Sequence, residues 1–193
     1  MFKKNKNFAF NFKNLGIFLV PAILFSIPFF SNIQDAKAGL EFQWDQDDGF
    51  RRLKWYQKEE KKRFRNTIYF FLRPNDRKAD LLKIDLAIPK TFKVTLDKEK
   101  ISLCKVRIGG FDERTKCLED IPADIEITND ESSLRRLNIY PYSPIPATKE
   151  SYAIVLKKFS NPKRSGLYQF HSYGQLKGQS VSSYLGSWTI VID

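Results

Sequence analysis

Apolar side chains recur at every second position through most of the chain after residue 66. Leu82–Ile88 is the clearest case, with apolar residues on one side and charged residues on the other. A period of two is typical of half-buried β-strands, and no run beyond the first 38 residues keeps helical spacing for three turns. Turn residues separate the runs about every 8 to 12 positions. We therefore predict an all-β fold of about nine short strands, a two-sheet antiparallel sandwich with an immunoglobulin-like Greek key.

Individual runs differ in how they fit that sandwich. Thr67–Leu72 is apolar on both faces and is expected to be an interior strand. Pro141–Pro146 lacks three backbone donors, which predicts an edge or polyproline crossing. The remaining strands are expected at residues 40–44, 92–96, 123–128, 137–140, 151–159, 166–173 and 184–192, and on both sides of a Gly-Gly turn at 109–110.

The first 38 residues have the order of a secretory signal peptide. Lysines precede the apolar run Leu15–Phe30, and the small residues Ala36 and Ala38 follow it. Signal peptidase needs small side chains one and three residues before the cut, and Gly39 comes next. We predict a cleavable leader at 1–38 and a single β-sandwich domain at 39–193.

The alternative for this segment is an uncleaved membrane anchor. The apolar run holds about 16 residues and contains Pro21 and Pro28, which is short of the roughly 20 needed to span a bilayer as a helix. No second apolar run follows. We expect the protein not to be transmembrane after cleavage, and to be exported to a periplasm or thylakoid lumen or outside the cell.

The charge balance of the chain favours anionic partners. The sequence has 33 Lys and Arg against 22 Asp and Glu. Five lysines and one aspartate belong to the leader, so the remainder has 28 basic and 21 acidic residues. Such an excess suits an anionic envelope polymer, a membrane surface or an acidic protein face, and it equally serves solubility.

Two cysteines, Cys104 and Cys117, fall in the predicted mature chain. The residues between them read as strand, Gly-Gly turn and strand, which would place the cysteines opposite each other across a hairpin. Cross-strand neighbours lie within the range that a disulfide bridges, and closing so short a loop stabilises the fold by about 3 kcal/mol. Without a C-x-x-C spacing or a nearby histidine, the pair indicates a structural disulfide rather than a redox or metal site.

The most charged stretch, Phe50–Arg65, is the candidate binding surface. Its candidate residues are Arg51, Arg52, Lys54, Trp55, Lys61, Lys62, Arg63 and Arg65, and the surface could extend to Lys157, Lys158, Lys163 and Arg164. Cations interleaved with aromatic rings are typical of single-strand nucleic-acid surfaces, but export argues against nucleic acid. The same chemistry fits an anionic glycan or a membrane surface. The alternative is a solvated basic loop or short frayed helix whose aromatic residues plug the core.

The one histidine of the sequence, His171, is the candidate for a catalytic base. Its neighbour Ser172 would point to the opposite face of the strand and could not be activated by it. The chain has no G-x-S-x-G, no H-E-x-x-H and no Gly-rich phosphate loop, and its single methionine is Met1. Paired carboxylates for glycoside hydrolysis depend on distances that sequence spacing does not give. We expect no enzyme activity, no metal and no cofactor.

Several motifs together resemble a cyanobacterial family of small exported proteins known as domain of unknown function 2808. They are residues 42–45, 52–54, 66–74, 103–104, 114–117, 145–147 and 184–190, so they span the predicted mature chain and include both cysteines. The resemblance implies an exported protein of cyanobacterial or related origin. It brings no reaction and no binding residues.

These observations favour a non-enzymatic binding or structural module of the cell envelope, with a basic surface for an anionic partner. Two other functions stay open. One is a lumenal accessory protein that docks on a membrane complex, and the other is a carbohydrate-active hydrolase.

Overall fold

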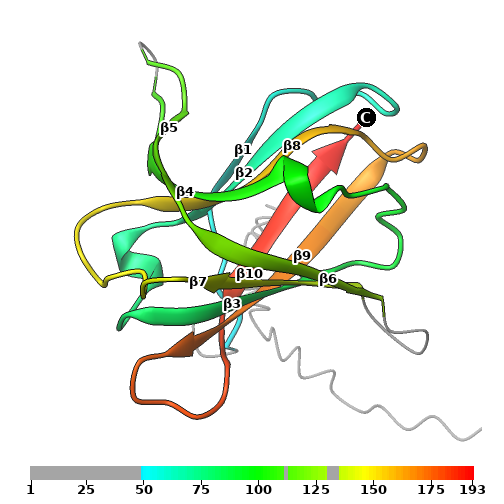
Figure 1. Ribbon diagram of the computed structural model, residues 1–193. Coiled ribbons are helices and arrows are strands. Elements are labelled where there is room, and N and C mark those ends of the chain that lie inside the picture. Colours follow the sequence, from blue (N-terminus) through cyan, green and yellow to red (C-terminus); the bar gives the residue numbers. More distant parts are fainter. Residues whose placement is uncertain (1–48, 111–112, 130–134) are drawn as a thin grey trace, which may run out of the picture. The chain divides into compact units, whose positions relative to one another are not determined.

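The computed structural model describes residues 49–110, 113–129 and 135–193 (Figure 1). The predicted leader, its cleavage residues and the strand expected at 40–44 lie outside them. The described part contains the strands β1 (Trp55–Gln57), β2 (Arg65–Leu72), β3 (Leu81–Ile88), β4 (Ile101–Arg107), β5 (Lys116–Ile121), β6 (Ala123–Asn129), β7 (Arg135–Pro141), β8 (Tyr152–Ser160), β9 (Gly166–Leu176) and β10 (Ser183–Ile192). Within it, no helix is long and apolar enough to cross a bilayer.

The strands form two antiparallel sheets, as the alternation predicted. Sheet I has the order β1-β2-β8-β4-β5 and sheet II has the order β10-β9-β3-β7-β6. The connections from β2 to β3 and from β8 to β9 are among those that cross between the sheets, and β2 is the neighbour of β8 while β3 is the neighbour of β9. The two strand pairs β2–β8 and β3–β9, joined by these connections, have the arrangement of strands B, C, E and F in an immunoglobulin-like Greek key. The predicted fold class is confirmed.

The core lies between the inner faces of the two sheets. Phe70 of sheet I packs against Phe170 and Trp188 of sheet II, with 4.9 Å between the ring centroids in each pair. Phe92 adds a further ring 4.9 Å from that of Phe170. All four side chains are at most 1% exposed, so burial of large aromatic surfaces supplies much of the stabilisation.

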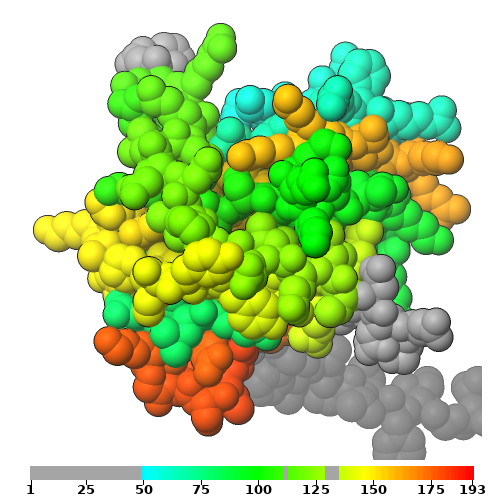
Figure 2. Space-filling view, viewed as in Figure 1, coloured from blue at the N-terminus to red at the C-terminus, as the bar shows by residue number. Residues whose placement is uncertain are grey.

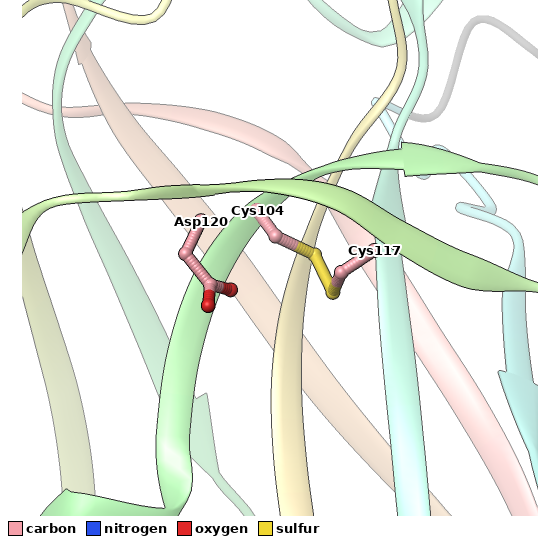
Figure 3. A group of neighbouring side chains, drawn as sticks. All are labelled: Cys104, Cys117 and Asp120. Atoms are coloured by element: carbon pink, nitrogen blue, oxygen red, sulfur yellow. A yellow bond between two sulfur atoms is a disulfide. The ribbon is translucent and has the colours of Figure 1, made fainter.

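A second buried cluster covers the outer face of sheet I, which explains why β2 is apolar on both sides. It contains Tyr69, Phe71, Cys104, Val106, Ala153 and Val155. The predicted disulfide between Cys104 and Cys117 is confirmed and joins β4 to β5 at the rim of this cluster, with 5.7 Å between the Cα atoms (Figure 3). The cysteines are not directly opposite, because a bulge pairs Cys104 with Asp120 and Cys117 with Val106.

Two local expectations were wrong. Residues 92–96, expected as a strand, have no ladder partner. The Arg135 guanidinium instead hydrogen bonds to two of their carbonyls, donating to Val94 O at 2.6 Å and to Phe92 O at 3.0 Å. Conversely, the basic stretch expected as a loop or helix contains the short strand β1, which pairs with β2.

The segment before β1 connects the two sheets. Arg52 bridges to Ser187 of β10 in sheet II, and a few residues later β1 pairs with β2 in sheet I. Gly186 permits this close approach, because a Cβ there would lie 2.7 Å from Leu53 Cγ and 2.8 Å from Arg51 O. Its φ of +146° is also unfavourable for other residues. One chain segment thereby closes this side of the sandwich.

Candidate functional site: a basic groove

A groove of about 640 Å³ lies where the end of β8 meets the segment 93–101. In Figure 2 the orange segment around residue 160 and the green segment around residue 95 approach each other at upper right. Six cationic residues line the groove: Arg63, Lys93, Lys100, Lys157, Lys158 and Lys163. Its apolar lining is Val94, Leu96, Ile101, Leu156 and Phe159. Concave walls of low polarity strengthen the field of cations placed on them.

The structure divides the predicted basic stretch between two places. Arg63 lines the groove, and Lys61, Lys62 and Arg65 are exposed in the same loop or at the start of β2. The other four candidates lie near β10 and β2 instead. Trp55 packs against the core, so its ring is engaged there rather than presented to a ligand. The stretch is therefore not one continuous surface.

Residues outside the predicted basic stretch complete the groove, and of these Lys157, Lys158 and Lys163 had been named from the sequence but Lys93 and Lys100 had not. Lys93 and Lys100 belong to the connection before β4, and Lys157, Lys158 and Lys163 belong to β8 and the turn after it. The sequence separates these groups from Arg63 by about 30 to 100 positions. The signal available in the sequence was the cluster of lysines around 157–163, but its pairing with Arg63 depends on the β2–β8 register.

Two buried asparagines hold the loop that carries Arg63. The Asn66 Oδ1 accepts from the backbone N–H groups of Lys58 and Glu59, at 3.2 and 3.0 Å. The Asn161 Nδ2 donates to Glu59 O and Lys61 O, at 3.1 and 2.9 Å. Because both asparagines are almost fully buried, these bonds are shielded from water and fix the loop backbone.

Arg63 and Lys158 both have left-handed backbones, with φ values of 66° and 52°. Among the described residues they are the two non-glycine positions with positive φ, and both line the groove. The left-handed conformation costs about 1 to 2 kcal/mol for an L-residue other than glycine. Such strain concentrates at functional positions, where surrounding contacts maintain it. Here Arg63 N donates to Pro162 O and Lys158 N to Thr67 Oγ1.

One carboxylate lines the groove, and it forms an ion pair with a lysine. Asp97 accepts from Lys100 Nζ at 2.8 Å and from Glu99 N at 3.1 Å. The Lys100 hydrogen bond, followed by that from the Glu99 backbone, lowers the pKa of Asp97 below its usual range. Five lining cations consequently face the groove without a carboxylate partner among the ion pairs of the described residues.

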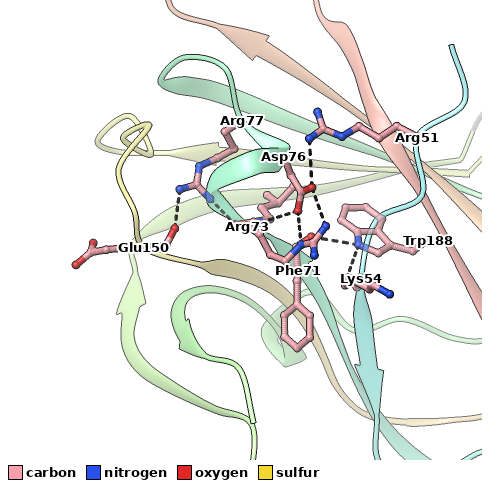
Figure 4. A network of polar contacts seen from close by, with 9 residues as sticks. Arg51, Lys54, Phe71, Arg73, Asp76, Arg77, Glu150 and Trp188 are labelled. Carbon is pink, nitrogen blue, oxygen red and sulfur yellow. Dashed lines mark hydrogen bonds and ion pairs between the residues drawn. The ribbon is translucent and has the colours of Figure 1, made fainter. Parts of the chain in front are cut away.

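The other end of the basic stretch is part of a structural network (Figure 4). Arg51 and Arg73 both approach the buried carboxylate of Asp76, at 3.5 and 3.0 Å. The carbonyls of Lys54 and Phe71 accept from Trp188 Nε1, at 3.0 and 3.2 Å. Paired and buried in this way, the network joins the segment before β1 to β2 and β10.

Arg77 forms a second structural contact beside that network. It is 4% exposed and donates to the carbonyls of Leu72, Thr148 and Glu150, while its guanidinium lies 4.8 Å from the ring centroid of Tyr152. Burial lowers the pKa of Arg77, against the opposing effects of Tyr152, Asp76 and Glu150. This arginine ties the residues before β8 to the end of β2.

His171 lies on the outer face of sheet II and does have a serine partner. Ser172 points into the core, as expected, but Ser187 of β10 lies directly across from His171. The Nδ1 of His171 is 2.7 Å from Ser187 Oγ, which is also 2.6 Å from the Tyr184 hydroxyl. The Ser187 side chain is fully buried and has two partners already, so it is not presented to a substrate as a nucleophile.

The one cluster of possible metal ligands among the described residues includes the two cysteines, whose sulfur atoms are bonded to each other. Cys104, Cys117 and Asp120 have ligand atoms within 4.8 Å of one another, and no other such group of three occurs in the part of the chain that the structure describes. Figure 3 shows the two sulfur atoms bonded to each other, with Asp120 beside them. A bonded sulfur pair offers no thiolate, so the group has no soft ligand for a transition metal.

The family described as "Protein of unknown function (DUF2808)" matches residues 46–192. The chain belongs to the DUF2808 family. The match covers every described strand and both cysteines, so the resemblance drawn from the motifs is confirmed. No curated protein matches the sequence of this DUF2808 protein.

Solved structures resemble the DUF2808 protein at low identity. BslA, a bacterial hydrophobin, has 11% identity and a TM-score of 0.45, with 75% of this chain and 95% of BslA covered. The collagen-binding domain of a Staphylococcus aureus adhesin has 12% identity and a TM-score of 0.36, covering 72% and 95%. ACE19, the collagen-binding subdomain of the Enterococcus faecalis surface protein ACE, has 13% identity and a TM-score of 0.38, covering 71% and 95%.

Proposed function

We propose that this DUF2808 protein is a non-enzymatic binding module that holds an anionic partner in the basic groove. The observation that carries the proposal is the convergence of six cationic side chains from three separate segments on one concavity. Cations that repel one another are brought together at a cost in stability, which a bound anion would offset. The left-handed backbones of Arg63 and Lys158 support the same conclusion, because glycine would be favoured there on stability alone.

The concave shape favours a chain-like anionic polymer of the cell envelope over a flat membrane surface. Charged segments of a polymer enter a groove and approach its walls, whereas lipid headgroups in a bilayer reach mainly its rim. The apolar walls would contact the uncharged backbone of such a polymer while the cations pair with its anionic groups. An acidic face of another protein, as in docking on a membrane complex, is the alternative that the test below separates.

The function is expected to be exercised outside the cytosol. A disulfide is typical of oxidising compartments, which supports export as a general statement. Removal of residues 1–38 and delivery to a periplasm or thylakoid lumen are the finer proposals. The intact mass of the natural protein tests them, because a species that still carries its first 38 residues would contradict cleavage.

Retention of the full chain on an immobilised sulfated polysaccharide tests the binding proposal. We expect elution to need high salt, since screening weakens the attraction of exposed charges. The charge-reversed variant R63E/K158E/K163E should elute far earlier than the wild type. A matched control, R107E/R114E/K116E, makes the same change of net charge on the exposed β4–β5 hairpin and should elute close to the wild type.

Two outcomes would overturn the proposal. Equal losses in both triple variants would mean that net charge alone causes retention. Retention that is indifferent to salt would also contradict it. Recovery of a membrane protein complex by crosslinking in cells, with no anionic polymer attached, would favour the docking alternative.

A further inference from the structure

The outer face of sheet II carries a group of rings and polar side chains that the basic groove does not use. The tyrosine face is defined here as Tyr140, Tyr173, Tyr184 and His171 with Asp85 and Lys83. Strand register places Tyr184, Tyr173, Asp85 and Asn138 in one row across β10, β9, β3 and β7. We propose that this row is a second binding site, which takes a neutral polysaccharide chain.

Three rings of the tyrosine face adjoin one another, and Tyr184 is tilted by 58° to Tyr173 and by 51° to His171. Tyr184 lies between its two neighbours, with 5.7 Å from its centroid to that of Tyr173 and 6.4 Å to that of His171. Tyr184 is 36% exposed, and the other two rings are half-buried. Pyranose sugars have apolar C–H faces, which pack on aromatic rings because both surfaces leave water. A strip of adjoining rings gives such a chain more than one contact.

The rings are held in place before any ligand arrives. The Tyr184 hydroxyl lies 2.6 Å from Ser187 Oγ, and His171 Nδ1 lies 2.7 Å from the same atom. On the other side of the row, Lys83 Nζ lies 5.2 Å from the ring centroid of Tyr140. Rings fixed in this manner lose little side-chain entropy on binding, which favours affinity for a weakly held ligand.

The two charged residues of the tyrosine face, Lys83 and Asp85, are paired with each other, which favours a neutral ligand over an anionic one. Lys83 Nζ lies 2.6 Å from Asp85 Oδ1, and Ser182 Oγ donates to Asp85 Oδ2 at 2.9 Å. Burial lowers the pKa of Lys83, but the hydrogen bond and charge of Asp85 outweigh this effect and raise it. The paired charges of Lys83 and Asp85 offset each other, and together with Asn138 these residues offer hydrogen bonds to sugar hydroxyls.

Affinity electrophoresis of the full chain in gels that contain hydroxyethyl cellulose or mixed-linkage β-glucan tests the inference. We expect the polysaccharide to slow the wild type, and added salt not to abolish the effect. Y173A and Y184A should lose at least three-quarters of the retardation. The control is Y142A, which removes a tyrosine that is 69% exposed outside the row and should behave like the wild type. The groove variant R63E/K158E/K163E should also keep neutral-glycan retardation.

A second measurement serves if the tyrosine variants unfold. The chain has one histidine, so the imidazole proton signals of His171 report on this face alone. Addition of a cello-oligosaccharide should shift those signals in the wild type. No shift and no retardation by either neutral polymer would overturn the inference. Retardation by acidic polymers only, lost in high salt, would also overturn it and would leave the groove proposal standing.

Discussion

The side-chain amides of Asn66 and Asn161 hydrogen bond to each other at 2.9 Å, although 95 residues separate them in the sequence. Asn66 is the second residue of the interior strand β2, and Asn161 follows β8, so their contact fastens the basic loop between β1 and β2 to the turn after β8. The cations of both segments line or adjoin the groove. Their relative positions therefore depend on this buried pair.

Replacement of Asn161 by alanine should lower the free energy of unfolding by about 2 kcal/mol, because it removes the side-chain donor to Glu59 O and Lys61 O and the acceptor for the buried Asn66 Nδ2. Chemical denaturation measures the change. The exposed Asn75 is the control, and Asn75→Ala should cost less than about 0.5 kcal/mol. Equal losses in the two variants would contradict the role given to Asn161.

Substitution of Arg63 by glycine should separate stability from binding. Relief of the left-handed φ of 66° should raise the free energy of unfolding by about 0.5 kcal/mol, after the entropy of glycine in the unfolded chain is subtracted. Retention on a sulfated polysaccharide should fall. Lys62→Gly, which removes a neighbouring cation outside the groove lining, should instead lose about 0.5 kcal/mol and keep most of the retention. A stable Arg63→Gly variant with unchanged retention would count against the groove.

Stability in acid should depend on the ion pair of Glu150 with Lys105. The hydrogen bond from Lys105 lowers the pKa of Glu150 below its ordinary value of 4.5. The pair therefore contributes stability above that value, and the contribution is lost as the pH falls through the lowered pKa. Glu150→Gln should flatten the acid part of a stability–pH curve. Glu126→Gln, a change at an exposed residue of β6, is the control, and a curve as flat as that of Glu150→Gln would refute the assignment.

Loss of the disulfide should destabilise the fold without rearranging it. The bond closes a loop between residues 13 positions apart, and the double variant C104A/C117A should lose about 3 kcal/mol in unfolding free energy. Thermal unfolding in the presence and absence of a reductant gives the same comparison on the wild type. A wild type that is unaffected by reductant while fully reduced would show that the staple contributes nothing.

The sequence predicts the sandwich because alternation and turn residues act locally. The alternation along Leu82–Ile88 and the doubly apolar run along β2 both correspond to the observed strands. The strand prediction for residues 92–96 was wrong although these residues do alternate. Arg135 donates to the carbonyls of Phe92 and Val94, and no described strand pairs with the segment. Sequence spacing does not reveal such a side-chain replacement of ladder bonds.

The candidate binding surfaces were harder to predict because they depend on strand register. The basic stretch was found from composition, yet Arg63 is the member that lines the groove, with partners from two other segments. For His171 the sequence suggested only its neighbour Ser172 as a partner, since Ser187 comes opposite His171 only when β9 and β10 are paired. Local composition identifies candidate chemistry, and long-range pairing decides which candidates meet.

The attachment of the first described strand to the last one sets an order for folding. Gln57 Nε2 donates to Val191 O at 2.7 Å across 134 residues, and the backbone at Arg52 forms a β-bridge with Ser187. A nascent chain cannot form these contacts until β10 has been synthesised. Both β1 and β10 must therefore be present before the sandwich is complete. During synthesis and translocation the chain would be incompletely folded.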